Sequence, residues 1–514
     1  MSRYKRYERY KDSGVEWIGE IPEHWKKMSL KMLASNEKNS FVDGPFGSDL
    51  KNEEYQDDGI PLIQLNNIVD GKHILQNLKF ISEEKAQELC RHIIYPNDIV
   101  IAKMAYPVAR AARVNEEYDK YVIVADCVKL KPNITKCDIR FLVYVINCPY
   151  VRSQAEIVAS GTTRLRISLG SLRNLQVFLP TLDEQKSIAD YLDQKTAEMD
   201  SLIADKEKLI KLLQEKRQAI ITEAVTKGLN PNVRMKDSGI EWIGEIPEHW
   251  RLSKIKYESL INNKTLSEST DDDYEIDYID ISSVTSIGEI DGVQSLNFKD
   301  APSRARRILS KGDTIVSTVR TYLKAIAFIE NAQSNLICST GFAVLTPLSK
   351  VVPKYLFYLM RSEKYVNEIV RRSVGVSYPA VNTSDIGALE CALPDRDEQM
   401  YIVEYLDNCT TQINQLLNDI QAQIQKLKEY RQSLISEAVT GKIDVRDYKD
   451  EGMSNLNLIK KVERRVSRMK NETIYLDRDM NQRFEKEFEA AKKDWEKDKQ
   501  EYEKQKRDND KKQF

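Results

Sequence analysis

The apolar and polar positions of this chain form a short-range pattern that occurs twice. Residues 95–103 (YPNDIVIAK) and 310–318 (SKGDTIVST) place alternating apolar residues directly after a turn, which predicts a β-strand in each. Residues 139–147 (IRFLVYVIN) and 353–361 (PKYLFYLMR) each predict a short helix. A mixed α/β domain that is present in two copies accounts for both halves of the chain.

Two longer segments, 179–228 and 393–442, align with each other without a gap, and each predicts a long helix. Neither contains proline or glycine between its first turn and its end, and acidic residues near each start suit a helix N-terminus. Apolar residues recur at steps of four and three, which is the spacing of a heptad seam. The seam positions are Ile188, Leu192, Met199, Leu202, Leu209 and Leu213 in the first helix and Ile402, Leu406, Ile413, Leu416, Ile420 and Leu427 in the second.

Polar residues interrupt this seam at Lys195, Lys206 and Lys216 in the first helix and at Gln423 in the second. A helix that is apolar along one stripe does not stand alone in water. We therefore expect the two long helices to pair with each other as an antiparallel coiled coil with pseudo-two-fold symmetry.

A third element of the repeat is a motif that opens each half. Residues 11–25 read KDSGVEWIGEIPEHW and residues 236–250 read KDSGIEWIGEIPEHW, so only Val15 and Ile240 differ. The distance between the copies is far longer than a solenoid repeat, which indicates two domain-sized units. We expect the tryptophans to pack the start of each domain against its core, with direct contact to a partner as the alternative.

These patterns predict an α+β fold. We expect two related mixed α/β domains at 12–178 and 237–392, and two spacer helices at 179–228 and 393–443. The remaining segment, 453–514, is dominated by charge, so we expect disorder or a solvated single helix, with a partner-dependent amphipathic helix as the alternative.

The composition narrows the class of protein. The net charge is −2, and no stretch approaches the length of a membrane-spanning helix. The first residues lack the apolar core of a signal peptide. The seven cysteines are scattered and never spaced C-x-x-C, which favours reduced thiols and no zinc site. We expect a cytoplasmic protein without membrane contact and without a bound metal.

Motifs for catalysis are absent from the sequence. A methyltransferase needs a glycine-rich adenosyl-binding turn and an Asn/Asp-Pro-Pro-aromatic tetrad, and residues 147–150 (NCPY) only approach the second. The sequence has no GxxxxGK[ST] phosphate loop either. We therefore expect a non-catalytic chain that holds no cofactor of its own.

Taken together, several motifs resemble the DNA specificity subunit of type I restriction-modification systems. They are IGEIPEHW in both halves, FVDGPFGSDL at 41–50, GIPLIQLNNI at 59–68, and the two helices that open LP-x-x-DEQ and close EAVT. The resemblance covers roughly residues 12–443. The second domain departs from the first because it has no counterpart of DGPFGS.

The resemblance implies two target-recognition domains, each of which reads one half of a bipartite site on double-stranded DNA. It also implies that the helices set the spacing between the half-sites and dock two methyltransferase subunits, which translocase-nuclease subunits join for restriction. S-adenosylmethionine, ATP and Mg are then expected on these partner subunits and not on this chain.

DNA recognition needs basic side chains near phosphates and polar side chains that reach base edges. Clusters of both kinds lie in segments that look like exposed loops. The candidates are Gln64, Asn66, Asn67, Lys103, Arg110, Arg113, Arg164, Arg166 and Arg173 in the first domain, and Arg304, Arg306, Arg307, Arg320, Lys324, Arg371, Arg372 and Tyr378 in the second.

Two alternatives remain open on the sequence. One is the recognition subunit of a related two-subunit restriction enzyme that cuts on both sides of its site. The other is a coiled-coil scaffold that organises proteins without binding DNA.

Overall fold

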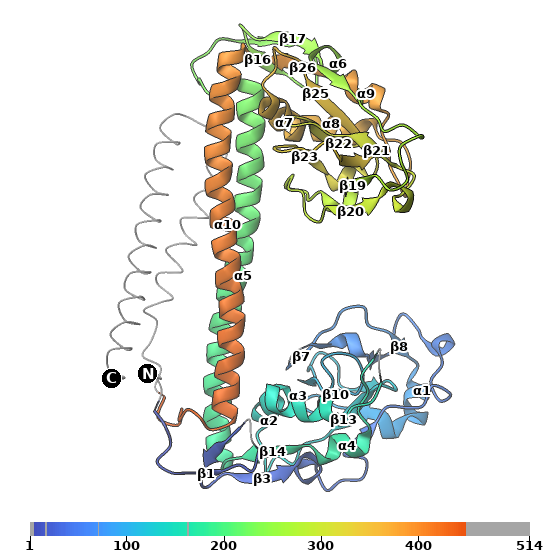
Figure 1. The fold of residues 1–514 in the computed structure, drawn as a ribbon. Helices are drawn as coiled ribbons and strands as arrows, with labels where there is room; N and C mark the ends of the chain where they lie inside the picture. Colours follow the sequence, from blue (N-terminus) through green and yellow to red (C-terminus); the bar gives the residue numbers. More distant parts are fainter. Residues whose placement is uncertain (1–4, 16–17, 70, 162–163, 449–514) are drawn as a thin grey trace. The chain divides into compact units, whose positions relative to one another are not determined.

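The computed structural model describes residues 5–15, 18–69, 71–161 and 164–448 (Figure 1). The predicted tail at 453–514 lies outside these residues. The described chain divides into two compact units, one formed by 5–205 with 423–448 and the other by 206–422. Each unit is described below by itself.

The first domain contains two main sheets. The larger has the strand order β4 (Phe41–Asp43), β13 (Cys127–Leu130), β10 (Ile99–Ala102), β11 (Ala111–Arg113), β7 (Gly71–His73), β6 (Ile68–Val69). The smaller has the order β8 (Phe80–Ile81), β5 (Ile60–Ile63), β12 (Tyr121–Ile123), β9 (Ile93–Ile94). Most neighbouring strands are antiparallel, but β11 with β7 and β12 with β5 are parallel.

Two strand pairs and four α-helices are the other main elements among the described residues of the first domain. The pairs are β1 (Tyr10–Asp12) with β2 (Glu20–Pro22) and β3 (Lys26–Ser29) with β14 (Gln176–Leu179). The helices are α1 (Glu83–Glu88), α2 (Ile139–Asn147), α3 (Pro149–Ile157) and α4 (Leu169–Asn174). The buried face of α2 packs in one core with strands β10 and β13 and with the start of the first long helix.

The second domain has the same kinds of element. One sheet has the order β18 (Ser259–Ile261), β25 (Phe342–Pro347), β22 (Thr314–Ser317), β23 (Ile326–Phe328). The other has the order β20 (Gln294–Asn297), β19 (Glu275–Ile279), β24 (Leu336–Ser339), β21 (Ala305–Ile308). The pairs are β15 (Met235–Asp237) with β16 (Glu245–Pro247) and β17 (Arg251–Lys254) with β26 (Glu390–Leu393). The helices are α6 (Ile255–Glu258), α7 (Pro353–Arg361), α8 (Glu363–Arg372) and α9 (Thr383–Gly387).

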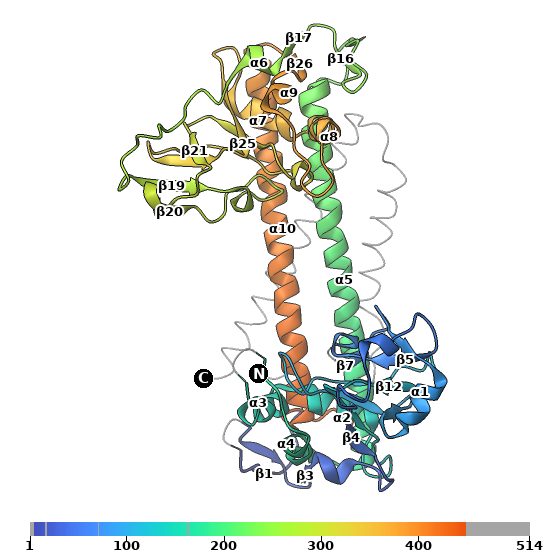
Figure 2. The same ribbon diagram turned by 90° about the vertical axis from the view of Figure 1, so that its right-hand side faces the viewer.

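Two long helices, α5 (Leu182–Lys227) and α10 (Arg396–Val439), run side by side (Figures 1 and 2). In the first unit, Leu192 near the start of α5 shares a core with Leu434 near the end of α10. In the second unit, Val225 near the end of α5 shares a core with Leu406 near the start of α10. Within each unit the helices are therefore antiparallel, as the sequence predicts.

The residues that the heptad spacing predicts to be buried between the long helices are only partly those that the structure buries. Among its members, Ile188, Leu192, Met199, Leu213, Ile402, Leu406 and Ile420 are buried, whereas Leu202, Leu209, Ile413, Leu416 and Leu427 are half-buried. The structure also buries Ile203 and Ile424, which the heptad spacing leaves out. After Ile420 the next buried residue of the helix is Ile424, four residues on, so Gln423 is not one of the buried positions.

The predicted fold class is confirmed. Both mixed α/β domains and both long helices are present, and the short helices predicted at 139–147 and 353–361 are α2 and α7. The pseudo-two-fold relation between the two domains stays a prediction.

Candidate DNA interface

The repeated opening motif fastens each domain to the start of a long helix. In the first copy, the indole Nε1 of buried Trp25 donates to Glu184 Oε1 at 3.0 Å, and His24 Nε2 lies 2.8 Å from Glu184 Oε2. In the second copy, Trp250 and His249 make the same contacts with Glu398. The motif therefore has the structural role that the sequence predicts.

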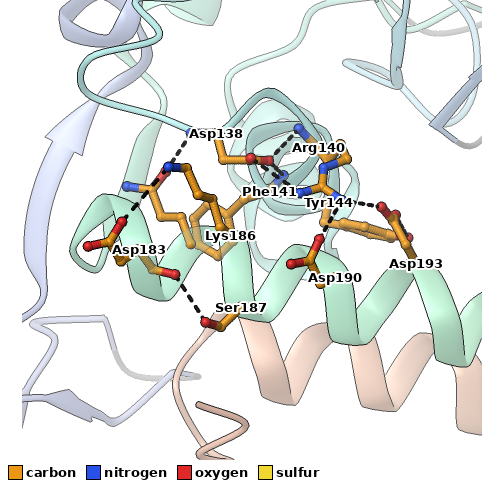
Figure 3. Close-up of polar contacts among 10 residues, drawn as sticks. Asp138, Arg140, Phe141, Tyr144, Asp183, Lys186, Ser187, Asp190 and Asp193 are labelled. Atoms are coloured by element: carbon orange, nitrogen blue, oxygen red, sulfur yellow. Dashed lines mark hydrogen bonds and ion pairs between the residues drawn. The ribbon is translucent and has the colours of Figure 1, made fainter. Parts of the chain in front are cut away.

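A second set of polar contacts holds helix α2 against helix α5 (Figure 3). The hydroxyl of Tyr144 donates to Asp193 at 2.8 Å, and Arg140 contacts both Asp190, at 2.7 Å, and Asp193, at 3.0 Å. In the second unit, Tyr358 of α7 donates to Asp407 of α10 at 2.6 Å. Each domain is thus held against its helix by polar contacts at equivalent positions.

In the first domain, two loops that are far apart in sequence are joined by main-chain hydrogen bonds. We call residues 103–110 together with the described residues 160–161 and 164–167 the first loop pair. Ala105 N donates to Leu165 O at 3.1 Å, and Ile167 N donates to Lys103 O at 3.0 Å. Ser160 and Arg166 exchange two further bonds across the later loop.

In the second domain, residues 318–325 and 374–381 form the second loop pair with the same bonding pattern. Arg320 N donates to Pro379 O at 2.7 Å, and Val381 N donates to Thr318 O at 2.8 Å. Val374 and Ala380 exchange two bonds across the later loop. The earlier loop of each pair directly follows a central strand, β10 or β22.

The two loop pairs also share an uncommon backbone conformation. Ala105 and Ala109 have φ angles of 70° and 61°, and the equivalent Arg320 and Lys324 have φ angles of 50° and 55°. Left-handed conformations cost free energy in residues other than glycine and persist where the surroundings enforce them. The loops are therefore a fixed frame that both domains use.

The side chains on this frame differ between the domains. The first loop pair carries exposed Arg164 and Arg166 on its later loop, whereas the second carries exposed Arg320 and Lys324 on its earlier loop. Tyr378 takes the position of Arg164, and the Arg320 guanidinium lies 4.8 Å from the centroid of its ring. The same backbone therefore presents positive charge from opposite loops in the two domains.

Ion pairs anchor two of the exposed arginines near the loop pairs. Arg166 lies 2.9 Å from Asp126 Oδ1 in the first domain, and Arg304 lies 2.6 Å from Asp280 Oδ2 in the second. Of the other predicted candidates, Asn66, Arg113 and Arg371 are also exposed, and Gln64 is half-buried. Arg371 is tied to Glu368 by two hydrogen bonds of 2.7 Å.

Four predicted candidates of the first domain have partners within it; Asn67 and Lys103 are buried and we drop them, whereas Arg110 and Arg173 are half-buried and stay predictions. Asn67 is fully buried and donates to two main-chain carbonyls, those of Ile74 and Gln76, and buried Lys103 lies 3.0 Å from Asp43. The guanidinium groups of Arg110 and Arg173 donate to main-chain carbonyls. Their charged or amide groups are already used within the domain.

Three candidates of the second domain also have internal contacts but keep part of their surface exposed. Arg306 stacks over the Phe298 ring, Arg307 donates to Thr265 Oγ1 at 3.0 Å, and Arg372 donates to Glu368 at 2.8 Å. They stay predictions.

Sequence reasoning missed the exposed apolar side chains beside these loops. Tyr106 in the first loop pair and Tyr322 in the second are 77% and 53% exposed, and Phe46 is 79% exposed. Phe46 follows Gly44, where a Cβ atom would lie 1.9 Å from Val124 O. The glycine thus lets the Phe46 loop pass close to residues 124–126, next to the first loop pair. The available signal was an aromatic residue between two glycines, in GPFG.

In the part of the chain that the structure describes, no cluster of three or more His, Cys, Asp or Glu residues could hold a metal ion. None of the described helices is long and apolar enough to cross a membrane.

Comparisons with known proteins support one family. The family model for the type I restriction modification DNA specificity domain matches residues 22–212 and 247–426. A putative type I restriction enzyme MjaX specificity subunit of Methanocaldococcus jannaschii is 22% identical over 84% of this chain and 96% of its own length. The StySPI specificity subunit of Salmonella potsdam is 23% identical over 83% and 90%. A chain from a study of complex assembly and conformational transition in a type I R-M system covers 82% of this chain and 99% of itself, with a TM-score of 0.62 at 15% identity.

Proposed function

The chain belongs to the family of the type I restriction modification DNA specificity domain, and on that premise we propose that it is the non-catalytic subunit that selects the DNA sequence for such an enzyme. Each mixed α/β domain reads one half of a bipartite site. The observation that carries this proposal is the pair of equivalent loop frames with different side chains.

The two loop pairs share a backbone conformation but carry different side chains. This combination suits a protein that recognises two different half-sites. The frame fixes how the loops meet a duplex, and contacts to phosphates position the domain without reading sequence. The side chains on the frame decide which base edges are contacted. Arg164 and Arg166 in one domain, and Arg320, Lys324 and Tyr378 in the other, would therefore make different contacts with phosphates and base edges at the two half-sites.

We further propose that α5 and α10 set the spacing between the half-sites and dock two methyltransferase subunits, with translocase-nuclease subunits joining for restriction. S-adenosylmethionine, ATP and Mg would then be bound by those partners, and the complex would act on cytoplasmic DNA. The hydrogen bonds from Trp25 to Glu184 and from Trp250 to Glu398 attach each domain to the start of a long helix. These attachments support the proposed spacing role, because helices that set a distance must hold the domains in fixed positions.

The first experiment is a methylome of the source cells with and without this gene. We expect a bipartite methyladenine motif to disappear on deletion and to return when the wild-type gene is supplied. Complementation with Arg320→Ala/Lys324→Ala should fail to restore full methylation, while Lys311→Ala, an exposed lysine at the opposite end of β22, should restore it. Persistence of every methylated motif in cells that express the complete system would contradict the proposal.

The coiled-coil scaffold alternative makes the opposite prediction. A scaffold that does not bind DNA leaves all methylation unchanged on deletion, and it shows no salt-dependent binding to duplex DNA. The basic side chains on both loop pairs favour the DNA-reading function.

A further inference from the structure

The later loop of the second loop pair presents apolar side chains to solvent. Val376 is fully exposed, Val374 is 79% exposed and Tyr378 is 66% exposed. Across the pair, Tyr322 is 53% exposed. Single exposed apolar residues are ordinary, but a group of this size on two adjoining loops is typical of an interaction site.

The backbone around these side chains is held on two sides. Val374 and Ala380 exchange hydrogen bonds of 2.8 and 2.9 Å, and Arg320 N reaches Pro379 O on the other side. The hydroxyls of Thr321 and Ser373 lie 2.7 Å apart and join the bases of the two loops. A loop with this many internal bonds does not fold its valines inward, so the apolar tip is already formed before a partner binds.

Two basic side chains lie near the apolar tip. Arg320 stacks on Tyr378, and Arg371, which is paired with Glu368, precedes the later loop with 71% of its side chain exposed. A partner that presents an apolar group beside negative charge fits this surface. In the major groove of DNA, phosphates flank the bases, and the 5-methyl group of thymine is the apolar group that the base edges present.

We propose that Val376, with Val374 beside it, reads thymine methyl groups in the major groove of the half-site bound by the second domain. The inference rests on the proposed function and names how one half-site is read. The first domain differs because Arg164, which suits a base-edge hydrogen bond, stands where the second domain has Tyr378. The later loop of the first domain therefore offers a polar contact at this position.

The test replaces thymine by uracil, which lacks only the 5-methyl group. The full chain, in complex with its methyltransferase partners, is titrated with duplexes that carry the methylated motif, and each thymine of one half-site is exchanged in turn. We expect at least one thymine in the half-site of the second domain to bind about fourfold more tightly than uracil, since burying one methyl group contributes about 0.8 kcal/mol. Uracil in the other half-site should leave the affinity unchanged.

The variants Val376→Thr and Val374→Thr assign the effect to the tip, because threonine keeps the shape of valine and exposes a hydroxyl. Val376→Thr should reduce the thymine-to-uracil ratio to about one, whereas Val293→Thr, at an exposed valine that precedes edge strand β20, should keep it. The inference is overturned if duplexes with thymine and with uracil bind equally well, or if the half-site contains no thymine. It is also overturned if Val376→Thr and Val374→Thr both keep the wild-type ratio of thymine to uracil affinity. These outcomes are distinct from failure of the proposed function, in which no motif depends on the gene.

Discussion

Asp200 on α5 lies 3.0 Å from Arg431 on α10, so a charged pair crosses the two long helices in the first unit. Lys72 of the first domain lies 3.3 Å from the other oxygen of Asp200. The equivalent positions in the second unit are Asn414 and Arg217. There, Asn414 Oδ1 is buried without a hydrogen-bond partner among the described residues, and Arg217 donates to the main-chain carbonyl of Ile287.

This difference predicts opposite effects of reciprocal substitutions. Asp200→Asn removes a partly buried charge from between two basic groups and should lower the free energy of unfolding by about 1 kcal/mol. Asn414→Asp should place a carboxylate beside Arg217 and raise it by a similar amount. Thermal unfolding of the full chain measures both, and a fall in Tm for Asn414→Asp would contradict the equivalence of the two sites.

The bond between Trp25 and Glu184 predicts a large cost for a conservative change. Trp25→Phe keeps an aromatic ring but removes the indole donor from a buried carboxylate, and hydrogen bonds to charged groups contribute about 1.5–3 kcal/mol. Trp242→Phe is the control, because that ring packs edge-on against Tyr365 and loses only packing. Urea unfolding should show the larger loss for Trp25→Phe, and equal losses would rule out a special role for the carboxylate contact.

Burial raises the pKa of Asp98 to about 6. Between its ordinary value near 4 and this value, the folded chain binds more protons than the unfolded chain, so the contribution of Asp98 to stability is present at low pH and is lost as the pH rises to about 6. Asp98→Asn keeps a carbonyl oxygen for the N–H of Tyr95 and removes the buried charge. At pH 7 the variant should be more stable by about 3 kcal/mol.

The measurement for Asp98 is the difference in free energy of unfolding between wild type and variant from pH 4 to pH 7. The difference should grow with pH and level off above pH 6. Burial also raises the pKa of Asp313, the equivalent residue of the second domain, so Asp313→Asn should change stability in the same direction. A difference that does not vary with pH would show that Asp98 is not the titrating group.

The basic side chains of the loop pairs predict how DNA affinity responds to salt. Each contact to a phosphate contributes nearly one unit to the slope of log K against log salt concentration. Arg320→Ala/Lys324→Ala should reduce this slope by about one to two units, as should Arg164→Ala/Arg166→Ala. Lys311→Ala should leave it unchanged. If both double variants keep the wild-type slope, these residues do not contact phosphates.

The duplicated motif and the helix spacing were sufficient to predict two related domains and two paired helices, because both features are local and repeat in sequence. The partner of the duplicated tryptophan was not predictable from periodicity, since Trp25 and Glu184 are distant in sequence and meet only in the folded domain. The heptad spacing missed Ile424 because the buried stripe takes a step of four residues after Ile420 and not the expected three.

The candidate site shows a similar division. Sequence clustering found Arg164, Arg320 and Tyr378, which lie on exposed loops, but it also selected Asn67 and Lys103, whose side chains serve the interior. Residue type alone cannot separate a basic group that faces solvent from a buried one that pairs with a carboxylate of the same domain. The apolar tip at Val376 was missed because exposure depends on main-chain bonds between segments that are distant in sequence.

The frame of the loop pairs also bears on how new specificities arise. Its bonds, such as those from Arg320 N to Pro379 O and from Ala105 N to Leu165 O, join main-chain atoms and do not depend on the identity of the side chains. Substitutions at the exposed positions therefore cost little stability. One domain can change the half-site that it recognises while the other domain keeps its own. New DNA specificities would then arise by successive substitutions on a single loop, and each intermediate protein would stay folded.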